Sequence, residues 1–124
     1  MAREKNEEAF TIGKKVFSET DLEFTVDYDG DVFTLKHPAP YQKAAIEAEI
    51  ARRLGGYSRD SFPAEHLALI EATTYVDALV VAEKSPNWWK SAWTCYDEEL
   101  IFNLFRGYYQ FRGKFQERIR GDGS

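Results

Sequence analysis

The chain has 124 residues, a length that fits one domain with a single core and excludes a two-domain enzyme. Apolar residues make up 44% and charged residues 30%, which is the composition of a folded domain and not of a disordered segment. Lys and Arg number 16 against 21 Asp and Glu, and the net charge of −5 argues against a protein that binds nucleic acid over its whole surface.

The scarcity of cysteine and histidine limits the chemistry that the chain can perform. Cys95 is the only cysteine, so it has no partner for an intramolecular disulfide. One cysteine and two histidines are also too few ligands for a cysteine-based zinc site. No apolar run approaches the roughly 18 residues of a membrane span, and the polar first residues contain no signal-peptide core. We therefore expect a cytoplasmic protein without a metal, a cofactor or a membrane anchor.

The chain divides into a charged start, one domain and a short tail. We expect residues 1–9 to be a flexible N-terminus, residues 10–120 to form a single α+β domain and residues 121–124 to be a flexible tail. A short apolar alternation over residues 10–17 fits either an edge strand or a loop.

Residues 23–36 carry the signature of a β-hairpin. Two alternating runs, 23–28 and 31–36, flank Asp29-Gly30, and Asp-Gly in this position favours a two-residue type I′ turn. The turn sets a register that begins with Tyr28 opposite Asp31 and ends with Glu23 opposite Lys36. The apolar side chains that share one face in this register are Phe24, Val26, Phe33 and Leu35.

Two helices are predicted after the hairpin, which ends at Pro38 and Pro40 because proline cannot continue the ladder. The first covers residues 41–54, has one narrow apolar stripe and stops at the glycine pair that follows it. The second covers about residues 63–83. Its second half is apolar nearly all round, so it should lie in the core.

The last helix begins at Asp97-Glu98-Glu99 and keeps apolar residues at helical spacing as far as Ile119. Gly107 and Gly113 within it cost about 1 kcal/mol each relative to Ala, which predicts a kink, a frayed end or a close approach to another element. The predicted fold is therefore α+β, with an N-terminal β-hairpin packed on a bundle of about three main α-helices.

The aspartates around Gly30 resemble part of a calcium-binding loop, but their spacing is wrong. An EF-hand loop counted from Asp27 needs Gly at its sixth position and Glu at its twelfth. Val32 and Pro38 occupy these positions here. The hairpin turn explains the same residues without a metal.

No catalytic constellation is present. His37 and His66 stand alone in the sequence and are interpreted as surface or capping residues. Cys95 is interpreted as a half-buried residue without reactivity, because the acids close by in sequence disfavour its thiolate. Asp77 is interpreted as structural, with its charge satisfied by a Thr hydroxyl or by Lys84. Since phosphate-binding glycine loops, nucleophile elbows and carboxylate pairs are also missing, we expect no enzyme and no catalytic residue.

Residues 105–115 mix aromatic and basic side chains, as single-stranded nucleic-acid binders do. The segment matches only the first three positions of the RNP1 motif. Its aromatics also recur at helical spacing, which favours an amphipathic helix with a basic solvent face.

Aromatic residues are the main candidates for a binding surface, because one core of this size can hardly surround all three tryptophans. We predict a partner-binding surface that includes Trp88, Trp89, Trp93, Tyr96 and Tyr109, since Trp and Tyr dominate interface hot spots. A short helical turn would place Trp89 and Trp93 on one side and Trp88 elsewhere. The alternative, that Trp89 and Trp93 only fasten the linker to the helices, stays open.

Four features follow one another between about residues 20 and 118. They are a hairpin ending in Lys36-His37-Pro38, a helix closing on Leu54-Gly55-Gly56, a long apolar helix before Ser85-Pro86, and a tryptophan linker leading into Asp97-Glu98-Glu99-Leu100. This order resembles that of the tail assembly chaperones of long-tailed bacteriophages. The resemblance implies a small, cytoplasmic, non-enzymatic factor that self-associates and binds the tape-measure protein before the tail tube polymerises. It also implies a second, frameshift-extended form of the same protein as a partner.

Two other functions fit the same residues. The first is a nucleic-acid-binding accessory or regulatory module that uses the basic aromatic C-terminal helix. The second is a phage structural protein of the head–tail connector or tail terminator kind.

Overall fold

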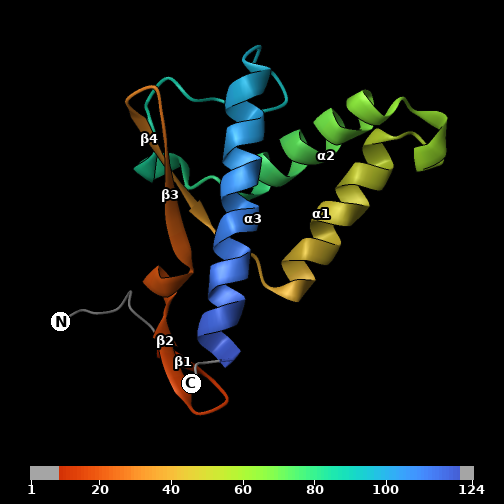
Figure 1. Ribbon diagram of the computed structural model, residues 1–124. Coiled ribbons are helices and arrows are strands. Elements are labelled where there is room, and N and C mark those ends of the chain that lie inside the picture. Colours follow the sequence, from red (N-terminus) through yellow and green to blue (C-terminus); the bar gives the residue numbers. More distant parts are fainter. Residues whose placement is uncertain (1–8, 121–124) are drawn as a thin grey trace.

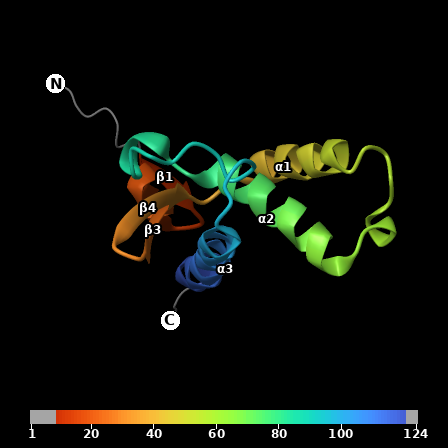
Figure 2. The same ribbon diagram turned by 90° about the horizontal axis from the view of Figure 1, so that it is seen from above.

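The structure is a computed structural model that describes residues 9–120. Two β-hairpins lie on one side of a long C-terminal helix and a pair of helices extends on the other side (Figures 1 and 2). The α+β class that the sequence predicts is therefore confirmed. The strands are β1 (Ala9–Ile12), β2 (Lys15–Ser18), β3 (Glu23–Tyr28) and β4 (Asp31–Lys36), and the α-helices are α1 (Pro40–Arg53), α2 (Ala64–Leu79) and α3 (Glu98–Arg120).

The hairpin β3–β4 has the predicted register from end to end, with Glu23 opposite Lys36 and Tyr28 opposite Asp31. Asp29 and Gly30 both have positive φ, of 55° and 89°, as a type I′ turn requires. The Asp27 carboxylate accepts a hydrogen bond from the Gly30 N–H at 3.2 Å and so helps to close the turn. The turn thus accounts for the aspartates of this segment.

Residues 9–18 form a second hairpin, β1–β2, so the open choice between strand and loop is decided in favour of strand. Its aromatic side chains attach it to the C-terminal half of α3, with the Phe17 ring 5.5 Å from that of Phe115. Ala9 already belongs to β1, and the remainder of the predicted flexible N-terminus, like the predicted tail 121–124, lies outside the described residues.

Helix α2 is shorter than the sequence predicts. It ends at Leu79, because Val80 turns to an extended conformation and forms an antiparallel bridge with Leu35 of β4. The Val81 N–H donates to the Thr34 carbonyl at 2.8 Å, so the chain leaves the helix to cover the outer edge of β4. The expected continuation to Glu83 is therefore wrong, since a contact distant in sequence overrides local helix propensity.

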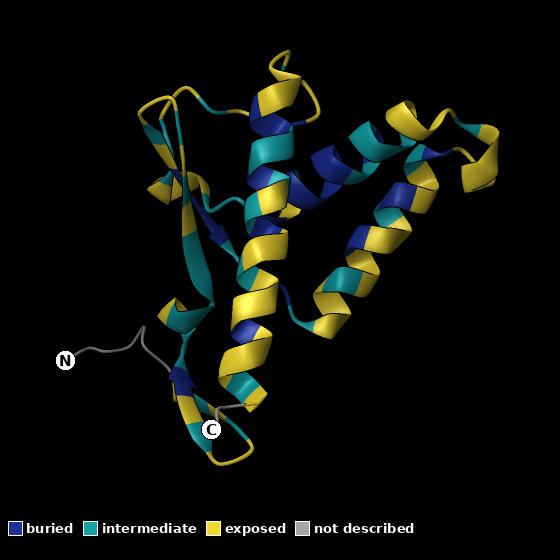
Figure 3. Ribbon diagram, in the orientation of Figure 1, coloured by how far each residue is buried: buried dark blue, intermediate teal, exposed yellow. Residues whose placement is uncertain are grey.

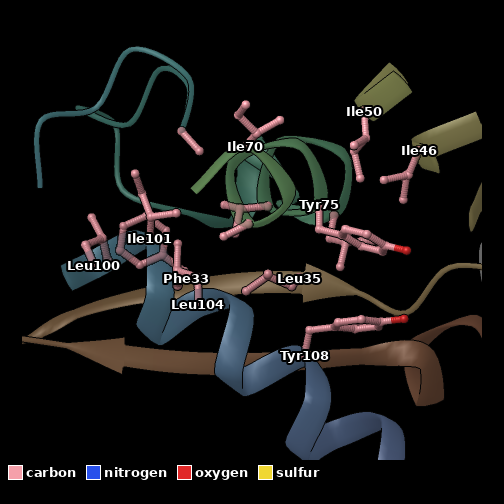
Figure 4. Close-up of a cluster of buried hydrophobic side chains, with 14 of the residues drawn as sticks. Phe33, Leu35, Ile46, Ile50, Ile70, Tyr75, Leu100, Ile101, Leu104 and Tyr108 are labelled. Atoms are coloured by element: carbon pink, nitrogen blue, oxygen red, sulfur yellow. The ribbon is translucent and has the colours of Figure 1, made fainter. Parts of the chain in front are cut away.

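The core lies where α2 and α3 meet the inner face of β3–β4 (Figures 3 and 4). Phe33 and Leu35 of β4 are fully buried there, as the alternation of the hairpin predicts. Helix α1 contributes its narrow apolar stripe from one side. The buried residues of this cluster are Phe33, Leu35, Ile46, Ile50, Leu54, Ile70, Ala72, Tyr75, Val76, Leu79, Ala92, Leu100, Ile101, Leu104 and Tyr108.

Gly107 allows α3 to approach β3 closely. A Cβ atom at this position would lie 2.5 Å from Cγ2 of Val26, nearer than real Cβ atoms come to another side chain. One turn further on, Phe24 stacks on Phe111 with ring centroids 4.7 Å apart. Of the three explanations open for this glycine, close approach is the one that the structure shows.

Candidate partner-binding surfaces

The tryptophan linker between α2 and α3 is anchored by Asp77. Its carboxylate accepts hydrogen bonds from the Ser91 hydroxyl at 2.8 Å and from the backbone N–H groups of Ala92 and Trp93 at 2.5 and 3.2 Å. The structural interpretation of Asp77 is therefore confirmed, but its expected partners are not. Lys84 instead pairs with Glu23 of β3 at 2.9 Å.

Trp88 and Trp89 both pack edge-on against Phe33 of β4. Their ring centroids lie 5.7 and 5.3 Å from that of Phe33. Trp89 is partly buried against the core, whereas Trp88 leaves 52% of its surface exposed. Trp88 thus offers an exposed indole that is held in place on one side.

Trp93 lies at a different place, under the C-terminal end of α1. The Arg53 guanidinium sits 4.0 Å from the centroid of the Trp93 ring, a cation–π contact. Arg53 is itself fixed by Glu49 at 3.0 Å and by the Thr74 hydroxyl at 2.9 Å. The predicted helical turn that would align Trp89 with Trp93 is wrong, because Asp77 holds the linker in an irregular conformation.

The two predicted tyrosines lie on separate elements. Tyr96 is fully exposed in the linker just before α3. Tyr109 lies half-exposed on α3, with its ring edge-on to Phe105 at 4.9 Å. The five aromatic residues are therefore distributed over the linker and α3, and no stacking contact joins Tyr109 to a tryptophan within residues 9–120.

A groove between α1 and α2, here called the α1–α2 groove, was not predicted from the sequence. Its volume is about 580 Å³. Ala45, Ile46, Ala78, Leu79 and Val80 supply apolar lining. The remaining lining residues are Lys36, His37, Pro38, Tyr41, Gln42, Glu49, Arg53, Thr74, Asp77 and Val81.

Charged groups in the α1–α2 groove already have partners within the fold. Hydrogen bonds from Arg52 and then Arg53 lower the pKa of Glu49 to about 2, so this carboxylate stays ionised and paired. Asp77 is occupied by the linker backbone, as described above. Tyr41, which lines the groove, is mostly exposed, whereas Trp93, in contact with Arg53, lies outside the groove. The apolar patch of the groove, with Tyr41 beside it, can therefore contact an apolar surface without leaving Glu49 or Asp77 unpaired.

His37 is not the surface or capping residue that the sequence suggests. Its ring lies half-buried within 6 Å of the rings of Tyr108, Phe111 and Phe115, at 5.8, 5.7 and 5.3 Å. Burial, followed by the positive charges of Lys43 and Arg112, lowers the pKa of His37. The imidazole is therefore held in its neutral form at neutral pH.

The other chemistry-bearing residues lie apart from one another. His66 is exposed and stacks on Phe62 at 5.9 Å, and Cys95 is half-buried in the linker. Within residues 9–120 no three His, Cys, Asp or Glu side chains come together in a way that could hold a metal ion. Among the same residues, no helix is both long and apolar enough to cross a bilayer.

Comparison with known proteins gives no match: neither a protein-family model, nor a curated protein, nor a solved structure is significantly similar to this chain.

Proposed function

We propose that this protein is a phage tail assembly chaperone that self-associates and binds the tape-measure protein in the host cytoplasm before the tail tube polymerises. The observation that carries the proposal is the α1–α2 groove. Its lining combines an apolar patch with the exposed ring of Tyr41, and its carboxylates, Glu49 and Asp77, are paired within the fold. The apolar patch consists of Ala45, Ile46, Ala78, Leu79 and Val80. Such a groove can receive the apolar face of a helix-rich partner without leaving a buried charge unpaired.

Substitutions in the groove test the proposal directly. Ala45 lines the groove and its neighbour Ala44 is exposed on α1 outside it. Ala45→Glu should abolish co-purification with the tape-measure protein encoded in the same genome, because the new carboxylate would be desolvated by the partner. Ala44→Glu makes the same chemical change and should retain capture.

Two results would contradict the chaperone proposal. One is equal capture by both variants and the parent. The other is recovery of the protein as a stoichiometric component of purified virions, which a connector or terminator protein would show and an assembly factor would not. A slippery heptamer near the end of the reading frame, followed by a long tape-measure gene, would support the proposal and the frameshift-extended partner.

A nucleic-acid-binding role is the second candidate, and the basic C-terminal half of α3 favours it. Arg112, Lys114 and Arg120 are exposed there, and Phe17 lies below the Arg118 guanidinium at 5.1 Å. A phosphate-binding stripe would give affinity for single-stranded DNA or RNA that falls steeply with salt. We expect no measurable binding near physiological salt, and a salt-dependent dissociation constant in the low micromolar range would favour this second role.

A further inference from the structure

The outer edge of β3 carries backbone groups without partners in the described fold. Thr34 of β4 uses both backbone groups on the side away from β3, its N–H donating to the Ser85 hydroxyl at 3.2 Å and its carbonyl accepting from Val81 at 2.8 Å. Thr25 stands directly opposite Thr34, so this is a non-hydrogen-bonded pair and the backbone groups of Thr25 also point away from the ladder.

The same geometry applies to Asp27, two residues along β3. No backbone hydrogen bond to Thr25 or Asp27 from outside the hairpin occurs within residues 9–120. The edge of β4 is covered by residues 80–85, whereas the edge of β3 is open over this stretch. An open strand edge is a template for one more strand.

Helix α3 runs beside this open edge and forms a groove with it, here called the β3–α3 groove. The groove has a volume of about 380 Å³. Side chains of both faces of β3 line it, which places it over the edge of the strand and not over one face. Its lining residues are Phe24, Thr25, Val26, Asp27, Asn103, Arg106, Gly107, Gln110, Phe111 and Lys114.

The β3–α3 groove is bordered by cations. Arg106 and Lys114 line it, and Lys114 also lines a neighbouring groove of about 740 Å³ together with Lys15 and Arg118. Only Asp27 and Glu117 contribute negative charge to these two grooves, although the chain as a whole carries −5. Within residues 9–120 neither Arg106 nor Lys114 forms an ion pair, and Arg106 bonds to the neutral Asn103 at 2.9 Å.

We propose that the β3–α3 groove binds an extended, acidic peptide segment of a partner protein, which adds to the edge of β3 as the third strand of the β3–β4 sheet. Main-chain hydrogen bonds to Thr25 and Asp27 would hold the segment, and its acidic side chains would meet Arg106 and Lys114. Phe24 and Phe111 stack on each other at 4.7 Å and are partly buried, so they do not offer the free aromatic faces that single-stranded nucleic acid uses. The groove is separate from the α1–α2 groove, and this inference does not rest on the proposed chaperone function.

The first test measures fluorescence anisotropy of a labelled short peptide that alternates Glu and Thr. We expect saturable binding that weakens at least about tenfold for Lys114→Glu, because an attractive charge becomes a repulsive one. Arg112→Glu, on the same helix but outside both grooves, is the matched control and should bind like the parent. Equal weakening by both variants, or no saturable binding to the parent, overturns the proposal.

The second test separates strand addition from attraction between charges alone. The same peptide N-methylated at alternate amides on its pairing edge should bind at least about tenfold more weakly, since its main-chain donors are lost. Thr25→Pro removes one outward-facing N–H of β3 and should have the same effect, whereas Thr25→Val retains it. If methylation has no effect, or if an oligo-dT of equal charge binds more tightly than the peptide, the groove is a general anion surface and the proposal fails; the methylated peptide decides this even if Thr25→Pro does not fold.

Discussion

Single residues show where the sequence conflicts with local preference, and Gly107 is the clearest case. A glycine in the middle of a helix is unfavourable by about 1 kcal/mol relative to Ala. The contact with Val26 explains why it is nevertheless there, because a methyl group would collide with β3. Gly113, in the same helix, has nothing within 4 Å of the position of a Cβ atom. The two glycines therefore look alike in the sequence and differ in the fold.

This difference gives a prediction with its own control. Gly107→Ala should lower the free energy of unfolding by about 1–3 kcal/mol, because the helix must move away from the hairpin. Gly113→Ala should leave stability unchanged or raise it by up to about 1 kcal/mol. Thermal unfolding followed by circular dichroism measures both, and a melting temperature for Gly107→Ala equal to that of the parent would contradict the close packing.

His37 makes stability depend on pH. Its pKa is lowered in the folded protein from an ordinary value of 6.5, so below that pH the unfolded chain binds more protons than the folded one. Stability is therefore fully present above about pH 6.5 and decreases as the pH falls toward the folded pKa. His37→Phe should flatten the change in melting temperature between about pH 7.5 and 5.5, whereas the exposed His66→Phe should not. Equal pH profiles for the parent and His37→Phe would show that burial of the imidazole has no energetic effect.

The elements of the fold differ in how far the sequence alone predicts them. The register of β3–β4 is predictable because alternation and the Asp-Gly turn are both local to residues 23–36. The end of α2 is not, since Val80 leaves the helix to pair with Leu35, far away in the sequence. The hairpin β1–β2 is predictable in part. The alternation of apolar residues over this segment is visible in the sequence, but the packing of Phe17 on Phe115, which stabilises the strand pair, is not.

The turn of β3–β4 can be tested at the level of this element. Gly30 has φ of 89°, a conformation that a β-branched residue adopts only with strain. Gly30→Val should destabilise the protein by about 1 kcal/mol and lower its melting temperature by several degrees. Asp29→Asn, at a φ of 55° that Asn tolerates, is the control and should melt with the parent. A melting temperature for Gly30→Val within about one degree of the parent would contradict the turn assignment.

At the scale of the whole molecule, the candidate surfaces are assembled from segments that are distant in sequence. The α1–α2 groove combines the end of β4, one face of α1, the last turns of α2 and the extended residues after it, so no local motif reveals it. The sequence shows only that α1 has one narrow apolar stripe, and this stripe does not indicate which other segments complete the groove. The aromatic residues were predictable as a group, but their division between Phe33 and Arg53 depends on how Asp77 fixes the linker.

Because Trp88 packs on Phe33 and apart from Trp93, substitution of Trp88 alone can test the proposed self-association. Trp88 exposes 52% of its surface, and its ring packs edge-on against the buried ring of Phe33. An exposed aromatic ring that is already held in one position loses little conformational freedom on binding, as interface residues require. Trp88→Ala should therefore lower the apparent mass in sedimentation velocity at a given concentration, with a loss of stability of only about 1 kcal/mol. Tyr57→Ala removes a still more exposed aromatic residue, between α1 and α2, and is the control that should sediment like the parent. If Trp88→Ala unfolds the protein, Trp88 belongs to the core, and if its sedimentation is unchanged, the proposed self-association does not use this residue.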